Sequence, residues 1–161
     1  MRNVRVHHYN AFSTDKDKGN PAGVVFDGEK LTEQQMIEVA KQVGFNKTVF
    51  VLESNEADLR LRYFTPGHEI NLCGHATVAS LYGLRSRGLL SKEDVLVETN
   101  VGILPVRVRT SADSPLMVTM KQAPPEFVEF KGSLEALTAS IGLTREDIDE
   151  NIPVVFGSTG I

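Results

Sequence analysis

Apolar and polar residues alternate in several short segments of this chain, which is the pattern of half-buried β-strands. Glycine, asparagine, serine or aspartate residues separate most of these segments, as expected for turns. The expected strands lie near residues 4–12, 22–26, 48–53, 58–65, 95–99, 103–109 and 115–122, and the apolar end of the chain, 152–161, begins another.

Two further segments carry helix signals at both ends. Thr32 is a typical N-cap, Gln35 completes a capping box, and Gly44 is a typical C-terminal stop, so a helix is predicted over about 32–43. Residues 133–141, closed by a glycine, predict a second helix after a proline break.

The segment 63–84 organises the rest of the chain. A strand runs into a Pro-Gly turn, and a helix is predicted over about 75–87. Between Ala76 and Leu84 this helix is apolar on too many faces for a surface helix, and it carries no charge before Arg85. Other elements must therefore surround it. The fold class expected is α+β, with a curved mixed sheet rolled around this helix, whose N-terminus is a natural seat for a carboxylate.

Composition excludes several functions. The chain has 161 residues, 41% of them hydrophobic and 24% charged, which suits one domain or one domain with a fragment of another. A net charge of −4 without a basic run argues against nucleic acid as a partner. No long apolar run predicts a membrane span and no apolar leader is apparent, so a cytoplasmic protein is expected. Cys73 is the only cysteine, which excludes an internal disulfide and a multi-cysteine zinc site, and no metal-spaced cluster is apparent.

Four blocks of sequence, GNPAGVV, FNKTVFV, RLRYFTP and LCGHATVAS, occur in this order along the chain. In order and spacing they resemble the PhzF family of phenazine biosynthesis-like isomerases. The resemblance implies a diaminopimelate epimerase-like fold of two lobes, each a sheet around a central helix, with the active site between them. Family members are about twice as long as this chain. By this comparison residues 1–123 form the first lobe, and 124–161 form the crossover and the beginning of an incomplete second lobe.

The resemblance also implies an activity: movement of a proton between carbons of a small carboxylate substrate without a cofactor. The family's proton-shuttling glutamate corresponds to Lys47 here. His75 matches a histidine that, in the family, lies beside the substrate and helps to hold or protonate it, so the resemblance predicts Lys47 and His75 as the catalytic residues. An ordinary lysine, with a pKa near ~10.4, is no base at neutral pH, although burial at a helix N-terminus would lower that pKa. Lys47 is therefore predicted either as a base or as a clamp for the substrate carboxylate.

Three more residues are predicted to bind substrate: Asn20 in the GNP turn, Cys73, and Gly74, which permits close approach of the backbone. In related epimerases and racemases a cysteine at the place of Cys73 is a thiol base, and the helix dipole would lower its pKa. Alternative functions are thus a cysteine-dependent amino-acid racemase or epimerase and a non-catalytic binding protein. The half-length chain alone is expected to lack a complete cleft, unless two copies pair as a homodimer.

Charged residues on the alternating strands, among them Arg60 and Arg62, are expected on the solvent side. Glu69, the acid of the FTPxxE block, is expected to have a mainly structural role in the turn before the central helix.

Overall fold

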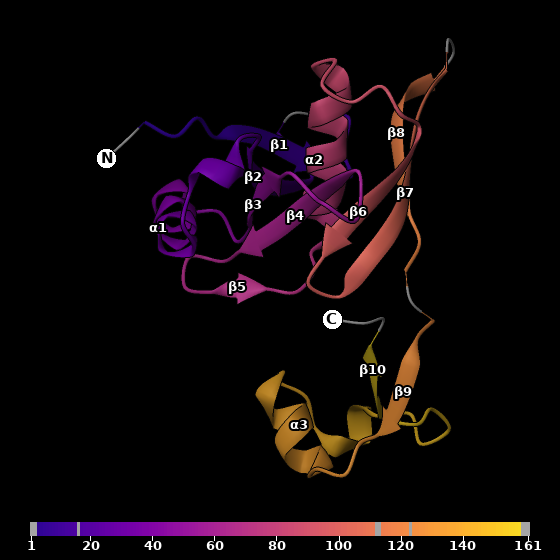
Figure 1. The fold of residues 1–161 in the computed structure, drawn as a ribbon. Coiled ribbons are helices and arrows are strands. Elements are labelled where there is room, and N and C mark those ends of the chain that lie inside the picture. The colour runs from indigo at the N-terminus through magenta and orange to yellow at the C-terminus, as the bar shows by residue number, and fades with distance from the viewer. Residues whose placement is uncertain (1–2, 16, 112–113, 123, 159–161) are drawn as a thin grey trace. The chain divides into compact units, whose positions relative to one another are not determined.

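The computed structural model describes residues 3–15, 17–111, 114–122 and 124–158 (Figure 1). The chain divides into two compact units, Met1–Lys121 and Gln122–Ile161. Each is described here by itself.

The first unit is one curved sheet of eight strands wrapped around a single helix. In sheet order the main strands follow β1-β2-β3-β4-β6-β7-β8, and the short β5 pairs with β4. The helix is α2 (Gly74–Ser86), within one residue at each end of the helix predicted over 75–87. The strands are β1 (His7–Ala11), β2 (Asn20–Val25), β3 (Thr48–Leu52), β4 (Leu59–Phe64), β5 (Glu69–Ile70), β6 (Asp94–Thr99), β7 (Gly102–Ser111) and β8 (Ser114–Met120).

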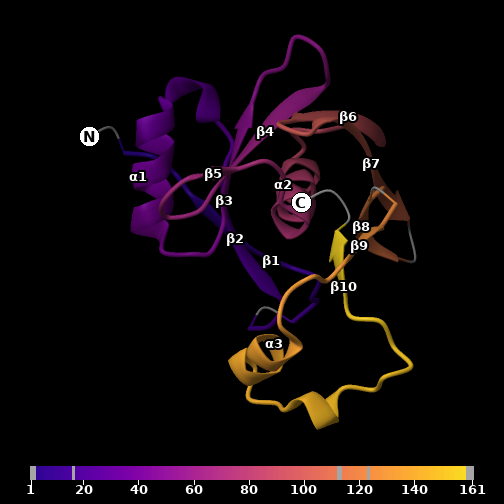
Figure 2. The same ribbon diagram turned by 90° about the horizontal axis from the view of Figure 1, so that it is seen from below.

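Figure 2 shows α2 almost end-on, with strands of the sheet on several sides of it. The inner face of the sheet and α2 share the larger apolar core, in which Leu61, Tyr63 and Leu81 are completely buried. Burial of this kind contributes about 25 cal/mol per Å² of apolar surface removed from water. The expected α+β architecture, a sheet rolled around a central helix, is confirmed.

A second core lies on the outer face of the sheet, where α1 (Glu33–Val43) covers β3 and β4. Met36 and Ala40 of this helix are completely buried, together with Phe50 and Phe64 from the strands. Both caps of α1 are as predicted, because Thr32 and Gln35 form a reciprocal capping box and Gly44 ends the helix with a φ of 73°. A short 3₁₀ turn, η1 (Gly28–Lys30), precedes it.

The second unit is small. It contains β9 (Glu126–Glu129), α3 (Leu134–Ser140), the 3₁₀ turn η2 (Arg145–Asp147) and β10 (Val155–Ser158). The helix expected over 133–141 is confirmed, with the Ser133 hydroxyl accepting from the Ala136 amide at its N-cap. The strand predicted at the end of the chain is also present, and it pairs antiparallel with β9, a strand that the sequence did not reveal.

Candidate functional site

The start of α2 lies where two parallel strands also begin. Asn20 is the first residue of β2, and Lys47 directly precedes β3. The two strands run parallel, and the Gly23 amide donates to the Lys47 carbonyl at 3.1 Å. Because parallel strands begin at the same edge of a sheet, the GNP turn and Lys47 lie at one end of the unit.

His75 occupies the first turn of α2 and is half-buried. Burial lowers its pKa, and the positive charge of Lys47 lowers it further, against the opposing effect of the Pro21 backbone. These effects place His75 within electrostatic reach of Lys47 and beside the residue that follows Asn20. The imidazole is therefore neutral at neutral pH, the form that accepts a proton.

Cys73 is the N-cap residue of α2 and is only 5% exposed. Its Sγ lies 3.3 Å from Nδ1 of His75. Burial raises the pKa of the thiol, and it outweighs the lowering effects of the Ala76 amide, the Lys47 charge and the His75 amide. The prediction that the helix dipole lowers the pKa of Cys73 is therefore wrong in its net direction. Cys73 is a protonated thiol at neutral pH.

The remaining predicted site residues belong to the same segments. Gly74 opens α2 between Cys73 and His75 and is half-buried, whereas Asn20 is exposed. Asn20 pairs with Ala11 of β1 at the beginning of β2. The structure thus places all five predicted residues on the segments that begin at this end of the unit.

Buried hydrogen bonds hold the first turn of α2 from the inside. The Tyr63 hydroxyl lies 2.7 Å from the Thr77 hydroxyl, which donates to the Cys73 carbonyl at 2.9 Å. Burial raises the pKa of Tyr63 far above its usual value, so its hydroxyl stays protonated. This chain of contacts ties the cap of α2 to β4. It is not predictable from sequence, because it depends on how the two elements pack.

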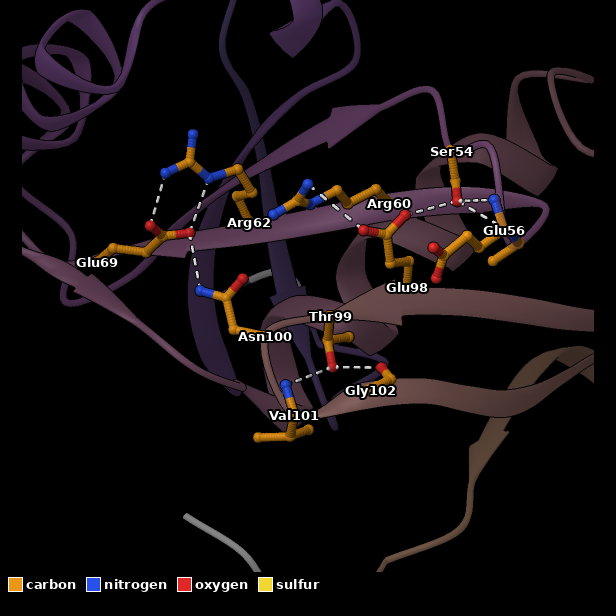
Figure 3. Close-up of polar contacts among 11 residues, drawn as sticks. Ser54, Glu56, Arg60, Arg62, Glu69, Glu98, Thr99, Asn100, Val101 and Gly102 are labelled. Carbon is orange, nitrogen blue, oxygen red and sulfur yellow. Dashed lines mark hydrogen bonds and ion pairs between the residues drawn. The ribbon is translucent and has the colours of Figure 1, made fainter.

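A second polar network holds the segment before α2 from the outside (Figure 3). Arg62 donates to Glu69 through Nε at 2.8 Å and through Nη2 at 2.6 Å, and its Nη2 also contacts Glu33 at 2.6 Å. Asn100 donates to Glu69 at 3.1 Å. The Arg62 side chain is only 17% exposed, so its expected place on the solvent side is wrong.

Hydrogen bonds and the charge of Arg62 lower the pKa of Glu69, so its carboxylate is ionised at neutral pH. The structural role predicted for Glu69 is consistent with these contacts. Glu69 belongs to β5, four residues before Cys73, so the network fixes the approach to α2. Arg62 and Tyr63 are neighbours on β4 and point to opposite faces of the sheet. Arg62 binds the segment before α2 through Glu69, and Tyr63 binds the first turn of α2 through Thr77.

The arrangement combines groups that attract a small anion with a group that can accept a proton from it. A cation, Lys47, and a neutral imidazole, His75, stand beside the positive end of a helix dipole. Among the described residues no group of three or more histidine, cysteine, aspartate or glutamate side chains is placed to hold a metal ion. Within the same part of the chain, no helix has the length and apolar character needed to cross a membrane.

Comparison with known proteins gives a consistent picture. A family model described as phenazine biosynthesis-like protein (PhzC-PhzF) matches residues 9–161. An uncharacterized isomerase of Bacillus subtilis (strain 168), YfhB, is 48% identical over 162 residues, which cover 100% of this chain and 55% of that protein. The trans-2,3-dihydro-3-hydroxyanthranilate isomerase of Pseudomonas aeruginosa is 28% identical over 142 residues, covering 86% of this chain and 50% of that enzyme.

A solved structure agrees with the sequence comparisons. The crystal structure of a phenazine biosynthesis protein of the PhzF family from Bacillus anthracis is 48% identical to this chain, with a TM-score of 0.89. The match covers 99% of this chain and 54% of that protein. The chain therefore spans about half the length of the relatives it matches.

Proposed function

The chain belongs to the PhzC-PhzF family of phenazine biosynthesis-like proteins, and from this membership we propose that it forms part of a cofactor-independent isomerase. The reaction moves a proton between carbons of a small carboxylate substrate. The observation that carries the proposal is the presence of Lys47 and a neutral His75 at the N-terminal end of the central helix. A cytoplasmic location is part of the same proposal.

In the proposed reaction Lys47 and the start of α2 hold the substrate carboxylate. His75 accepts a proton from one carbon, the electron pair of that C–H bond shifts along an adjoining double bond, and a proton returns to the carbon at the far end. The lowered pKa of His75 supports its role as acceptor. Lys47 stands where the family's glutamate is expected, so the proton carrier in this chain is the histidine rather than a carboxylate.

Asn20, Gly74 and Cys73 are proposed to line the bound substrate. Asn20 is exposed at the start of β2 and offers an amide, and Gly74 lets the substrate approach the backbone closely. Cys73 is almost buried and offers a neutral thiol beside His75. These three residues orient the substrate and take no proton from it.

The division of the chain into lobes is part of the proposal. Residues 1–123 form the first lobe, and 124–161 form the crossover and the beginning of a second, incomplete lobe. A complete cleft then needs a second lobe, from a longer polypeptide or from a second copy of this chain. Light scattering distinguishes these possibilities, because a monomer of the 161-residue chain would count against pairing of two copies.

The experiment is deuterium wash-in, followed by mass spectrometry, with the full-length protein and a panel of cyclic and amino-acid-like carboxylates. Lys47→Ala and His75→Ala should each lower the exchange rate by about 10²-fold or more. Lys41→Ala on α1 and His68→Ala in an exposed turn are matched controls and should leave the rate unchanged. No exchange by the unaltered protein across the panel would contradict the proposal.

One contact favours a second candidate, a racemase or epimerase that uses Cys73. Its Sγ lies 3.3 Å from the His75 ring, close enough to lose a proton to it. Burial and the raised pKa argue against a thiol base. Unchanged exchange in Cys73→Ser would exclude this candidate, whereas loss of all exchange would favour it over the histidine mechanism.

A non-catalytic binding protein is the remaining alternative, since Lys47 occupies the expected place of the acid-base glutamate. The variant Lys47→Glu distinguishes a non-catalytic binding protein from an active isomerase. Isomerase activity that appears only in Lys47→Glu would indicate a protein that has kept the fold and lost the chemistry. Activity in the unaltered protein that this substitution does not raise would indicate a working lysine-containing site.

A further inference from the structure

A basic pocket lies at the end of the first unit opposite His75. Helix α2 begins at Gly74 and ends at Ser86, so its two ends are roughly 20 Å apart at 1.5 Å per residue. Arg87 is the C-cap residue of α2, and His7 begins β1, whose other end pairs with Asn20. The chain therefore brings His7 and Arg87 together far from the site proposed for isomerisation.

Arg87 is held in place by three uncharged groups. Its Nε donates to the Tyr9 hydroxyl at 3.0 Å and its Nη2 lies 2.8 Å from Nδ1 of His7. Its guanidinium carbon lies 5.3 Å from the centre of the Phe26 ring. Burial, followed by the charges of Arg87 and Arg5, lowers the pKa of His7, so this histidine is a neutral acceptor. The guanidinium is thus oriented by these groups without pairing with a carboxylate.

The pocket beside Arg87 has a volume of about 770 Å³, and a second arginine, Arg5, is among the residues that line it. The charge of Arg5 is close enough to lower the pKa of His7. In the part of the chain that the structure describes, neither arginine forms an ion pair with a carboxylate. Asp27 is the one carboxylate on the pocket wall, and it pairs with Lys30 at 3.2 Å. The pocket is therefore lined by two arginines and by one carboxylate that already pairs with a lysine.

A structural role alone does not account for this arrangement. A single cation at the C-terminal end of α2 is favourable because it offsets the negative end of the helix dipole, and Arg87 fulfils that role. The second arginine, Arg5, lines the same pocket, and capping of the helix does not require it. The Nη1 group of Arg87 has no partner among the contacts of the described residues, so donors remain for a ligand.

We propose that the pocket lined by Arg5, Arg87 and Phe26 binds a small phosphate-bearing dianion. Arginine forks match the oxygen geometry of a phosphate group, and two of them balance its two charges. The Phe26 ring and Leu89 supply an apolar wall for the group that carries the phosphate. The site is independent of the proposed isomerase activity, because none of its residues belongs to the N-terminal end of α2.

The test is titration of the chain with inorganic phosphate, and then with a phosphate monoester, at low ionic strength and pH about 7.5. Amide chemical shifts locate the binding, and their dependence on concentration gives Kd. Arg87→Gln should weaken binding by about 10-fold or more, and Arg5→Gln by about 3-fold to 10-fold. Arg109→Gln, an exposed arginine on β7 outside this pocket, is the matched control and should change Kd by less than about 2-fold.

Arg87→Lys is a second variant for the case in which Arg87→Gln does not fold. It keeps the positive charge but loses the planar guanidinium with its fixed pair of donors. It should weaken binding by about 3-fold or more while circular dichroism stays unchanged. No saturable shift near His7 and Arg87 below about 10 mM phosphate would overturn the proposal. Shifts confined to residues around His75, or equal affinity in Arg87→Gln and Arg109→Gln, would overturn it as well.

Discussion

Replacing Glu69 by glutamine removes the charge at the centre of the network before α2. The carboxylate accepts from Arg62 at 2.8 and 2.6 Å and from Asn100 at 3.1 Å. Glutamine has nearly the same shape and keeps one oxygen acceptor. The other carboxylate oxygen is replaced by an NH₂ group, which is a donor and faces the guanidinium. The variant therefore loses one charged hydrogen bond and the ion pair, and leaves Arg62 with Glu33 as its remaining carboxylate.

The magnitude follows from burial. The side chains of Arg62 and Glu69 are 17% and 19% exposed, between an exposed pair, worth up to about 1 kcal/mol, and a fully buried one, whose disruption costs about 3–5 kcal/mol. We expect Glu69→Gln to lower the free energy of unfolding by about 2 kcal/mol. Glu33 also contacts Arg62 at 2.6 Å, but its side chain is 61% exposed, so Glu33→Gln should cost about 0.5 kcal/mol or less.

Urea unfolding monitored by circular dichroism measures both variants. A loss of about 2 kcal/mol should lower the urea midpoint by roughly 1 M. Because the pKa of Glu69 is lowered in the folded state, its stabilisation is complete above the unfolded value near 4.5 and disappears as the pH falls through the folded value. On acidification, Glu69→Gln should therefore lose less free energy of unfolding than the unaltered protein does. Equal midpoints for Glu69→Gln and Glu33→Gln at neutral pH would refute this reasoning.

Three further predictions concern the helix and its first turn. Gly83→Ala should lower the free energy of unfolding by about 1–3 kcal/mol, since the new Cβ would lie 2.8 Å from an aromatic ring, whereas Gly67→Ala, with open space around it, should be nearly neutral in the same urea assay. The pKa of His75 measured by NMR should lie below 6.5 and rise in Lys47→Ala, and an unchanged pKa would contradict the proximity of the two residues. Cys73 should react with iodoacetamide more slowly than a free thiol at neutral pH, and faster labelling would contradict its burial.

Local signals predicted the helices well. The caps of α1 depend on Thr32, Gln35 and Gly44, which act within a few residues of each other, so the sequence alone fixes both ends. The central helix was recognisable because its apolar residues cover too many faces for a surface position. By contrast, β9 is exposed along its whole length and lacks alternation, and only its pairing with β10 defines it.

The candidate site was predictable only in part. The resemblance to a family identified Lys47, Cys73 and His75, and the structure places them on neighbouring segments. The contacts of Glu69 with Arg62 and Asn100 are not predictable from sequence. Asn100 lies 31 positions after Glu69, and the alternation of β4 alone predicts that Arg62 faces solvent. The direction of the Cys73 pKa shift is not predictable from sequence either, since the sequence reveals the helix terminus but not the extent of burial that opposes its effect.

The central claim is that His75, with Lys47 beside it, moves a proton between carbons of a carboxylate substrate. The most direct measurement is the rate of deuterium incorporation into such a substrate by the full-length protein and by its His75→Ala and His68→Ala variants. The proposal predicts exchange by the unaltered protein, a loss of about 10²-fold or more in His75→Ala and an unchanged rate in His68→Ala. Equal exchange by all three proteins would contradict it.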